Sequence, residues 1–304
     1  MKNLTVLAIG GNAISADSHE QEDKNILRTF RGIEELIRCG PLVITHGNGP
    51  QVGRLLAKLK LPLWLHTGQT QGEISSLLQL NLRKYLKAYD IEKPIVSLMS
   101  HVLVDPKDTS FVKPVKPVGV AFNKSTAQKL KKQGLTVEQD ARNPDFYRRL
   151  VPSPKPIDVI EIEAIKILLE QGCIVITGGG GGIPIQKTPA GPIPVEAVVD
   201  KDYTSSIIAS RLKAETLIFL TNIEYAMISF GTGDQRPLEN SDLQTAKNLS
   251  ATFKTGMKTK IDASIDFLEN RGLLRGQKNR KVLIGNVFKL REMLDGKSGT
   301  LLTN

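Results

Sequence analysis

Short apolar runs in this chain end repeatedly at glycine or polar residues, and helix-like periodicity follows several of them. The runs are Leu4–Ile9, Leu42–Thr45, Ile174–Thr177, Leu217–Leu220 and Lys281–Ile284. Helical spacing of apolar residues follows the first two, at Asn25–Arg38 and Gln51–Lys60. Uninterrupted apolar strands that alternate with helices are typical of a mainly parallel sheet covered on both faces. The pattern therefore predicts an α/β fold.

Three of the predicted strands end in glycine-containing loops, at the edge where an α/β sheet binds its ligands. The loops are Gly10-Gly11-Asn12, His46-Gly47-Asn48-Gly49-Pro50-Gln51 and Gly178–Gly182. Glycine lets backbone N–H groups approach an anion closely, because no side chain stands in the way. One such loop is also typical of a flexible turn, but three at strand ends indicate a phosphate site.

The segment from Asp105 to Pro156 interrupts the alternation of strands and helices. It is rich in proline and in basic residues, and it contains one helical stretch near Ser125–Gln133. We expect an inserted hairpin or lid between two halves of the fold.

Composition places the chain among ordinary globular proteins. Of its 304 residues, 40% are hydrophobic and 24% are charged, which argues against a disordered or fibrous chain. The apolar runs are too short to cross a bilayer, and Met1–Gly11 is better explained as a strand entering a loop than as a signal peptide. The two cysteines, Cys39 and Cys173, give neither a disulfide framework nor metal-ligand spacing. We expect a cytoplasmic protein with no membrane partner.

The charge is concentrated in the inserted segment. The chain carries 41 Lys and Arg against 31 Asp and Glu, and residues 113–155 alone hold ten basic and three acidic residues. Such a local field suits an anionic ligand or a nucleic acid, and it is also typical of a solvated basic surface. The segment offers few aromatic stacking groups and no recognised RNA motif, so we expect no nucleic-acid partner.

The standard nucleotide signatures are absent. Gly296-Lys297-Ser298 resembles the end of a P-loop, but Arg291 stands where the earlier glycine is required. In Gly47–Val52, valine replaces the last glycine of the dinucleotide fingerprint. A Rossmann dehydrogenase is therefore disfavoured.

Several lysines stand near the predicted loops. Asp200-Lys201-Asp202 follows an apolar run, and its carboxylates are suited either to aligning the ammonium or to binding Mg²⁺. Lys116 lies in the basic insertion, and Lys258 and Lys260 begin a helix-like segment. Phosphoryl transfer needs such cations over phosphate oxygens more than it needs a strong base. His46 has no partner at ligand spacing, so we expect it to order its loop.

Taken together, these motifs resemble the carbamate kinases of the amino acid kinase superfamily, nearly from end to end. The matching stretches are Gly10–Ala13, Val43–Gly53, Val104–Pro106, Lys116–Gly119, Arg148–Pro154, Gly178–Ile183, Glu196–Asp202 and, in part, Gly296–Thr300. The His-Gly-Asn-Gly-Pro-Gln loop and the Pro-Ser-Pro after paired arginines are specific to carbamate kinases within the superfamily.

The resemblance implies a single domain over residues 1–304, built as a three-layer αβα sandwich with a mainly parallel central sheet and a protruding lid. An acid-binding lobe would span residues 1–155, including a basic lid at 105–155, and a nucleotide-binding lobe would span 156–304. The activity implied is reversible phosphoryl transfer between carbamoyl phosphate and ADP, giving ATP and carbamate. It would use Mg²⁺ with ATP or ADP, in a cytoplasmic homodimer that serves arginine metabolism.

The resemblance also assigns roles to individual residues. Lys116 would reach the carbamoyl phosphate from the lid, Lys201 would contact the transferred phosphoryl group, and Lys260 would bind nucleotide phosphates. Asp200 would orient Lys201 or help place Mg²⁺, with no metal site made by the protein alone. The residues implied to cradle the phosphate and carbamoyl oxygens are Gly10, Gly11, Asn12, Gly47, Asn48 and Gly49. Those implied to bind nucleotide are Gly178, Gly179, Gly180, Thr221, Met257 and Lys260.

Two segments depart from the family pattern. A Gly-Ala-Met-Ser-Gln-Gly loop that opens a helix at the acid site is here Thr67–Gly72, and Gly-Ser-Met-Gly-Pro-Lys is here Thr255–Lys260. The first change bears on the choice of acid, and the second adds Lys258 near the nucleotide. Two alternatives therefore stay open: a kinase for another small carboxylate or phosphate, and a nucleotide or metabolite sensor without catalysis.

Overall fold

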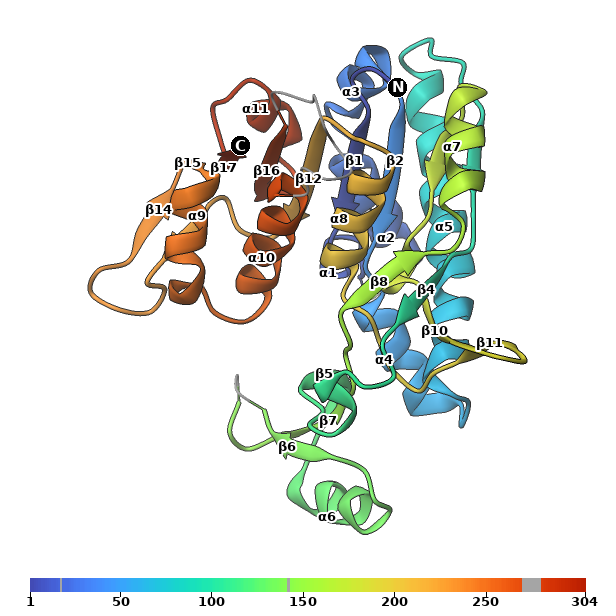
Figure 1. The fold of residues 1–304 in the computed structure, drawn as a ribbon, viewed down its shortest axis with the longest axis vertical. Helices are drawn as coiled ribbons and strands as arrows, with labels where there is room; N and C mark the ends of the chain where they lie inside the picture. Colours follow the sequence, from blue (N-terminus) through green and yellow to red (C-terminus); the bar gives the residue numbers. More distant parts are fainter. Residues whose placement is uncertain (17, 141–142, 270–279) are drawn as a thin grey trace.

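An eight-stranded sheet runs through the body of the protein in the computed structural model, which describes residues 1–16, 18–140, 143–269 and 280–304 (Figure 1). In spatial order its strands are β15 (Asn240–Asp242), β17 (Thr300–Thr303), β16 (Lys281–Asn286), β12 (Thr216–Thr221), β1 (Thr5–Ile9), β2 (Leu42–His46), β9 (Ile174–Ile176) and β3 (Ile95–Ser97). Neighbouring strands are parallel except for the pair β16–β17. The five predicted strands are confirmed to within two residues.

Each central strand sends alternate side chains to opposite faces, as the two-residue period of a strand requires. In β1, Val6 and Ala8 join one buried cluster, and Leu7 and Ile9 join the other. The helices covering the first face are α7 (Ile162–Glu170), α8 (Lys201–Arg211), α9 (Leu243–Leu249) and α10 (Thr255–Glu269). The helices covering the second are α1 (Gly11–Ile14), α2 (His19–Thr29), α3 (Ile33–Cys39), α5 (Leu63–Lys87) and α11 (Leu290–Leu294). The predicted αβα sandwich is confirmed.

The helix expected at Asn25–Arg38 is two helices, α2 and α3. The chain breaks between them, and Gly32, which precedes α3, has a φ of +93°. A β-carbon at this glycine would lie 3.0 Å from the backbone nitrogen of Arg291, so the turn needs both the left-handed conformation and the missing side chain. Periodicity alone does not reveal such a break, because both helices bury apolar residues against the same face.

A second, four-stranded sheet lies beside the main one and supports the insertion. Its strands are, in order, β11 (Gly191–Pro194), β10 (Ile183–Thr188), β4 (His101–Val104) and β8 (Pro156–Val159). A short hairpin of β13 (Ala226–Ile228) and β14 (Arg236–Leu238) lies in the C-terminal part of the chain. The remaining short turns are the 3₁₀ segments η1 (Thr109–Phe111), η2 (Gly179–Gly181) and η3 (Ser250–Thr252).

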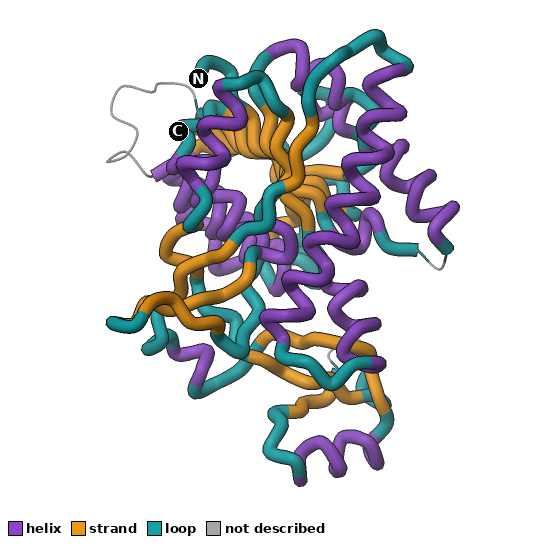
Figure 2. The backbone as a smooth tube through the Cα atoms, turned by 90° about the vertical axis from the view of Figure 1, so that its right-hand side faces the viewer, coloured by secondary structure: helices purple, strands orange, loops and turns teal. Residues whose placement is uncertain are grey.

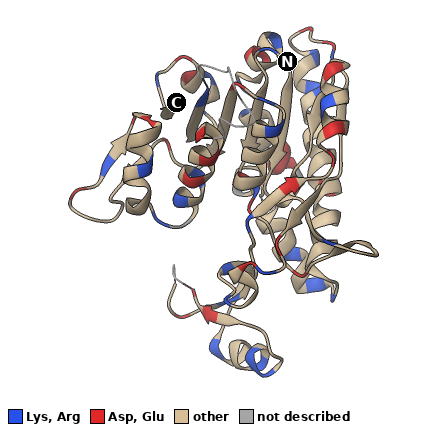
Figure 3. Cartoon of the chain, in the orientation of Figure 1, with Lys and Arg blue, Asp and Glu red and all other residues tan. Residues whose placement is uncertain are grey.

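A small subdomain, called the lid below, projects from the body in both views (Figures 1 and 2). It consists of β5 (Lys116–Phe122), α6 (Lys124–Lys132), β6 (Val137–Gln139) and β7 (Tyr147–Val151), with β7 between the other two strands. Helix α6 confirms the predicted helical stretch, and Figure 3 shows Lys and Arg spread over it. Arg142, which was counted with this basic segment, lies outside the described residues. The lid rests on α4 (Gly49–Lys58), the helix predicted at Gln51–Lys60.

The division of the body does not fall at residue 155 as expected. Strand β9 pairs with β2 and β3, and β8 and β10 pair with β4, so the segment from 156 to 211 packs with the N-terminal strands. The C-terminal half begins at β12, where the order of the sheet reverses next to β1. Among the described residues, no helix combines the length and the apolar character needed to cross a membrane.

Candidate active site

The loops that follow the parallel strands meet at one edge of the main sheet. Backbone hydrogen bonds join them, from Gly10 N to Leu220 O (3.1 Å) and from Gly47 N to Ile9 O (2.9 Å). A third runs from Val287 N to the carbonyl of Thr221 at the end of β12 (2.8 Å). The predicted loops at Gly10 and Gly47 therefore lie side by side at the reversal between β1 and β12, where doubly wound sheets bind ligands.

Helix α8 begins at this edge and carries the Asp-Lys-Asp motif. Asp200 is its N-cap, and its Oδ1 accepts a hydrogen bond from the backbone N–H of Asp202 (3.1 Å). Ser205 donates to the carbonyl of Lys201 (2.7 Å), so the hydroxyl of Thr45 in β2 donates to Ser205 in turn (2.7 Å). The first turn of α8 is thus held against the central sheet, and Lys201 is fixed beneath the loops.

Two lysines share the carboxylate of Asp202. Lys201 Nζ lies 2.6 Å from Asp202 Oδ1, and Lys260 Nζ from α10 lies 2.9 Å from Oδ2. The three side chains are 10%, 13% and 4% exposed for Lys201, Lys260 and Asp202. Lys201 Nζ also lies 5.7 Å from the ring centroid of Phe219 in β12. The structure therefore brings together Lys201 and Lys260, which lie 59 positions apart in the sequence, as two buried cations around one buried carboxylate.

The pKa values follow from this arrangement. Burial lowers the pKa of Lys201, and the charge of Lys260 lowers it further, while Asp202 and Asp200 oppose the shift. Burial acts in the same sense on Lys260, but the charge and hydrogen bond of Asp202 outweigh it and raise the pKa of that lysine. Burial of Asp202 is outweighed by the two ammonium groups, which hold the pKa of its carboxyl well below the usual range. Asp202 therefore stays ionised and keeps both cations in place.

Asp200 pairs with a lysine of the lid. Its Oδ2 forms a short ion pair with Lys116 Nζ from β5, so Asp200 connects the lid to the start of α8. Lys116, which is predicted to reach the acid from the lid, therefore contacts the N-cap residue of α8. The predicted role of Asp200, orienting Lys201 or helping to place Mg²⁺, stays a prediction.

The glycine loops are packed on one another without room for side chains. A β-carbon at Gly47 would come 2.7 Å from Gly11 N, and one at Gly11 would come 3.1 Å from Asn48 N. At Gly180 it would come 2.0 Å from Asn48 Nδ2. Gly10 lies at the end of β1, Asn12 lies in α1, and Gly49 begins α4 with open space over its α-carbon. The close packing requires glycine at positions 11, 47 and 180.

The turn at Gly178, Gly179 and Gly180 lies with the acid-side loops, not with the nucleotide residues as expected. It follows β9, which is three strands away from β12 and adjacent to β2. At a strand spacing near 4.8 Å this separation is about 14 Å. The packing of Gly180 on Asn48 shows the same neighbourhood. The order of strands in the sheet, which the sequence does not reveal, decides this correction.

His46 is fully buried beneath that turn. Its Nδ1 lies 3.2 Å from Gly47 O, which can only accept, so Nε2 accepts from the hydroxyl of Ser75 (3.4 Å). Burial lowers the pKa of His46 to about 4, and the charge of Lys201 adds to the shift. A β-carbon at Gly179 would lie 2.6 Å from the imidazole. The side chain is neutral at pH 7 and orders its loop.

The divergent segment Thr67–Gly72 is helical and lies in the first turns of α5. Thr70 Oγ1 accepts a hydrogen bond from Asn48 Nδ2 (2.9 Å). Gln71 makes two hydrogen bonds to the backbone of Ser100, and Ser100 Oγ accepts from Gly178 N (3.0 Å). The sequence predicts that Asp202 aligns the Lys201 ammonium or binds Mg²⁺, but it gives Thr70 and Gln71 no individual roles. These residues stand in motifs of the sequence, but their roles depend on partners that are distant in the sequence.

The residues predicted for the nucleotide lie on the C-terminal side of Lys201. Thr221 ends β12, and Met257 lies in the first turn of α10, where its side chain packs against the core. Lys258 does not join the buried cluster, because its Nζ is bound by Asp262 (3.0 Å) and Ser250 Oγ (3.1 Å) on the exposed side of α10. The extra cation of this segment is therefore already paired.

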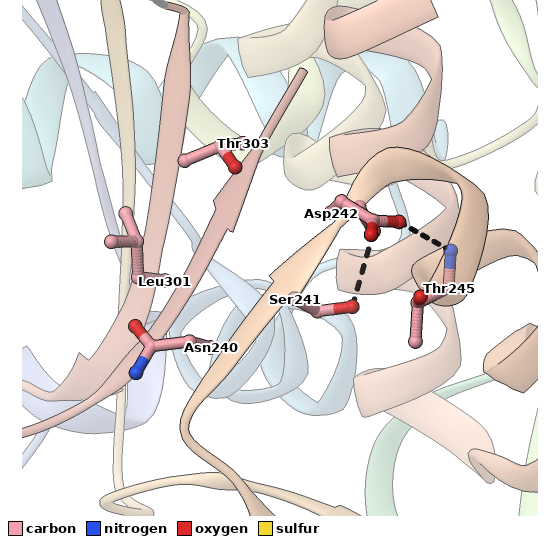
Figure 4. Close-up of a pocket in the computed structure, with 6 residues that line it drawn as sticks. All are labelled: Asn240, Ser241, Asp242, Thr245, Leu301 and Thr303. Atoms are coloured by element: carbon pink, nitrogen blue, oxygen red, sulfur yellow. Dashed lines mark hydrogen bonds between the residues drawn. The ribbon is translucent and has the colours of Figure 1, made fainter.

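In the part of the chain that the structure describes, the lysine cluster has no metal cage, and a cavity lies elsewhere. Within the described residues, no three His, Cys, Asp or Glu side chains gather as metal ligands. A cavity of about 360 Å³ lies at the far edge of the main sheet, lined by residues of β15, β17 and α9 (Figure 4). Because β15 and β17 are four and three strands away from β1, the cavity is separate from the lysine cluster.

Comparison with known proteins defines the class to which this fold and site belong. Residues 3–286 match the sequence model of the amino acid kinase family, and the chain belongs to that family. An N-acetylglutamate synthase structure from Neisseria gonorrhoeae shares the fold, with a TM-score of 0.60 and 17% identity over 61% of that chain.

More similar proteins lie within one branch of the family. The carbamate kinase-like protein YqeA of Escherichia coli is 37% identical, with 99% of each chain covered. A carbamate kinase of Pyrococcus horikoshii is 35% identical over the whole of both chains. The structure of a Giardia lamblia carbamate kinase bound to AMP-PNP has a TM-score of 0.86 and 30% identity, covering 99% of this chain and 98% of that one.

Proposed function

We propose that this protein is a carbamate kinase that transfers a phosphoryl group reversibly between carbamoyl phosphate and ADP, giving ATP and carbamate. The observation that carries the proposal is the buried arrangement of Lys201, Asp202 and Lys260 next to the packed glycine loops. The full-length similarity to carbamate kinases supports the choice of substrate.

The arrangement suits phosphoryl transfer by positioning and charge neutralisation. The reaction breaks the P–O bond to the acyl oxygen and forms one to a terminal oxygen of ADP, and no group on the protein has to be covalently modified. Lys201 lies between the acid-side loops and α10, so we assign it to the transferred phosphoryl group. Lys260 would bind the nucleotide phosphates and Lys116 the acyl phosphate. Fixed cations in a poorly solvated site stabilise developing negative charge more strongly than water does.

Backbone N–H groups at Gly11 and Gly49 would hold the oxygens of the small acid. Gly10 and Gly47, whose N–H groups donate to Leu220 and Ile9, would shape the loops around it. The role in binding oxygens extends to Gly179 and to Gly180, which packs beside Asn48, while Gly178 holds the turn in place through its N–H bond to Ser100. On the other side of Lys201, Thr221 and Met257 would contact the nucleotide. The AMP-PNP in the Giardia lamblia structure supports an ATP or ADP ligand here.

Mg²⁺ would enter as the nucleotide complex. The described residues do not fit a cage of protein ligands, because the carboxylates nearest the site, Asp200 and Asp202, are each bound by lysine. Mg²⁺ is commonly bound through substrate phosphates and water with little help from protein carboxylates. No step proposed here depends on a metal held by the protein.

We also propose a cytoplasmic homodimer, as the resemblance to carbamate kinases implies. Strand β8 is the edge of the four-stranded sheet, and Ile157, Ile160 and Ile167 on β8 and around α7 are about half exposed. Exposed apolar side chains at a sheet edge are a feature of association surfaces.

The direct test is ATP formation by the purified protein from carbamoyl phosphate, ADP and Mg²⁺. We expect turnover with carbamoyl phosphate well above that with other small acyl phosphates. Turnover only with another acceptor would replace carbamate as the substrate, in keeping with the altered Thr67–Gly72 segment. Tight ADP binding without turnover on any acceptor would show a sensor instead.

A further inference from the structure

The side-chain amide of Asn48 is held in one orientation by the turn at Gly180 and by Thr70, which the proposed reaction does not otherwise use. We propose that Thr70 positions Asn48 so that its Oδ1 accepts a hydrogen bond from an N–H group of the acyl phosphate. This contact would select a carbamoyl group over an acetyl or carboxyl group. The inference rests on the proposed function, and it names the residue that makes the enzyme specific for the carbamoyl group.

The orientation follows from the single proton of the Thr70 hydroxyl. Thr70 is fully buried, and its Oγ1 lies 2.9 Å from the carbonyl of His66 and 3.0 Å from that of Thr67. Carbonyl oxygens only accept, so the hydroxyl proton is used there and Thr70 can only accept from Asn48. The Asn48 atom at 2.9 Å must therefore be the NH₂ group, Nδ2, and Oδ1 lies on the other side.

The glycine turn holds the same amide from a second direction. A β-carbon at Gly180 would lie 2.0 Å from Asn48 Nδ2 and 2.3 Å from its Cγ. The amide thus lies flat against the backbone of Gly180, whose φ of +61° also favours glycine. Asn48 is the N-cap of α4, but its side chain makes no capping hydrogen bond, because it is committed to Thr70.

This arrangement leaves one acceptor free in the loop that approaches Lys201. Within the described part of the chain, Asn48 Oδ1 has no hydrogen-bond partner, and the residue is half-buried. Asn48 follows Gly47, where a β-carbon would lie 3.5 Å from Cδ of Lys201. The free oxygen therefore belongs to the loop that we assign to the acid.

An acceptor in this place distinguishes acyl groups of nearly equal size. The carbamoyl group carries an NH₂ that can donate to Oδ1. An acetyl group carries a methyl there, which leaves the oxygen unpaired, and a carboxylate places lone pairs against it. Sites that hydrogen-bond a substrate group reject analogues that lack it much more strongly than apolar pockets do. Because Asn48 is only half-buried, we expect a selectivity of about 10- to 100-fold from this contact.

The test compares kcat/KM for carbamoyl phosphate and acetyl phosphate, each with ADP, in the wild type and in two variants. Thr70→Val keeps the shape but removes the acceptor, so we expect the preference for carbamoyl phosphate to fall about tenfold. Thr70→Ser keeps the hydroxyl, and we expect it to retain the preference. The melting temperature of each variant reports folding, and Thr70→Ala replaces the valine variant if that one does not fold.

The outcomes separate the inference from the proposed function. If the wild type shows the preference and Thr70→Val keeps it unchanged, Thr70 does not set specificity and the inference is wrong. The same holds if Thr70→Ser loses as much preference as Thr70→Val. If the wild type forms no ATP from carbamoyl phosphate, the proposed function fails first, and the inference fails with it.

Discussion

Lys201 is the residue whose surroundings bear most directly on catalysis. Its ammonium is buried and paired with a carboxylate that Lys260 also binds. Such a cation adds much more in a poorly solvated site than a surface lysine does, because little water competes with it. Lys258, two positions before Lys260, differs from Lys201 because it is exposed and paired with Asp262.

We predict that Lys201→Ala lowers kcat for ATP formation by on the order of 10² or more, since a donor to developing negative charge is removed. Lys258→Ala is the control, and its kcat is expected to stay within about twofold of the wild type. Steady-state kinetics measures both. A near-wild-type rate for Lys201→Ala would reject the role of this lysine.

Asp202 sets the protonation of both buried lysines. We predict that Asp202→Asn moves the alkaline limb of the kcat–pH profile to lower pH. Burial already lowers the pKa of Lys201, and loss of the opposing charge of Asp202 lowers it further, so the ammonium is lost earlier as pH rises. Asp262→Asn, which removes the carboxylate bound by exposed Lys258 and by Ser250, should leave the limb in place. If the alkaline limb in Asp202→Asn does not move, or moves to higher pH, the role assigned to Asp202 is wrong.

His46 makes the free energy of unfolding of the protein depend on pH. Its pKa is about 4 when folded, against an ordinary value of 6.5, so the unfolded chain binds the proton more readily. Its contribution is complete above pH 6.5 and is lost as pH falls toward 4. We predict about 2 kcal/mol less stability at pH 5 than at pH 8 from this residue, and His46→Gln should remove that difference.

Urea unfolding at the two pH values measures the effect on stability. Proton NMR of the His46 imidazole gives a second measurement that does not depend on how well the variant folds. A His46 resonance that titrates near pH 6.5 in the native protein would refute the prediction.

At the level of the elements, the lid reaches the site through a contact between two glycines. A β-carbon at Gly53 in α4 would lie 3.2 Å from the α-carbon of Gly119 in β5. Strand β5 also carries Lys116, so the distance between α4 and β5 helps to place that lysine at Asp200. The two elements can approach this closely because Gly53 lacks a side chain.

We predict that Gly53→Val raises the KM for carbamoyl phosphate by on the order of tenfold, because the larger side chain displaces β5 and Lys116. The KM for ADP should change by less than about twofold, since Lys260 lies on α10 and does not depend on the lid. Gly72→Ala, a helical glycine with open space over its α-carbon, is the matched control. Equal changes in both KM values would show a general loss of structure instead.

At the scale of the whole molecule, the edge strand β8 and helix α7 define the surface for the proposed homodimer. We predict that light scattering gives twice the chain mass, and that Ile160→Glu combined with Ile167→Glu gives a monomer, because a charge replaces an exposed apolar side chain at each position. Phe230→Glu, at an equally exposed apolar residue in the C-terminal half, should leave the mass unchanged. A wild-type monomer would refute the proposal.

The sequence by itself determined the class of fold and the chemistry of the main groups. Apolar runs such as Leu42–Thr45 predict strands, because side chains on both faces of such a strand must be buried. Lys201 can be singled out because an aspartate stands on each side of it. Glycine-rich loops likewise show themselves locally, since their conformation depends on few neighbours.

The tertiary structure alone decided which of these groups meet. In the folded chain, Lys260 forms an ion pair with Asp202, and Asp200 forms one with Lys116. The turn at Gly180 packs against Asn48 rather than beside the nucleotide residues. The tertiary structure also broke the helix expected at Asn25–Arg38. Each result depends on strand order or on contacts between distant segments. Such contacts are selected by packing of the whole chain, and no local pattern records them.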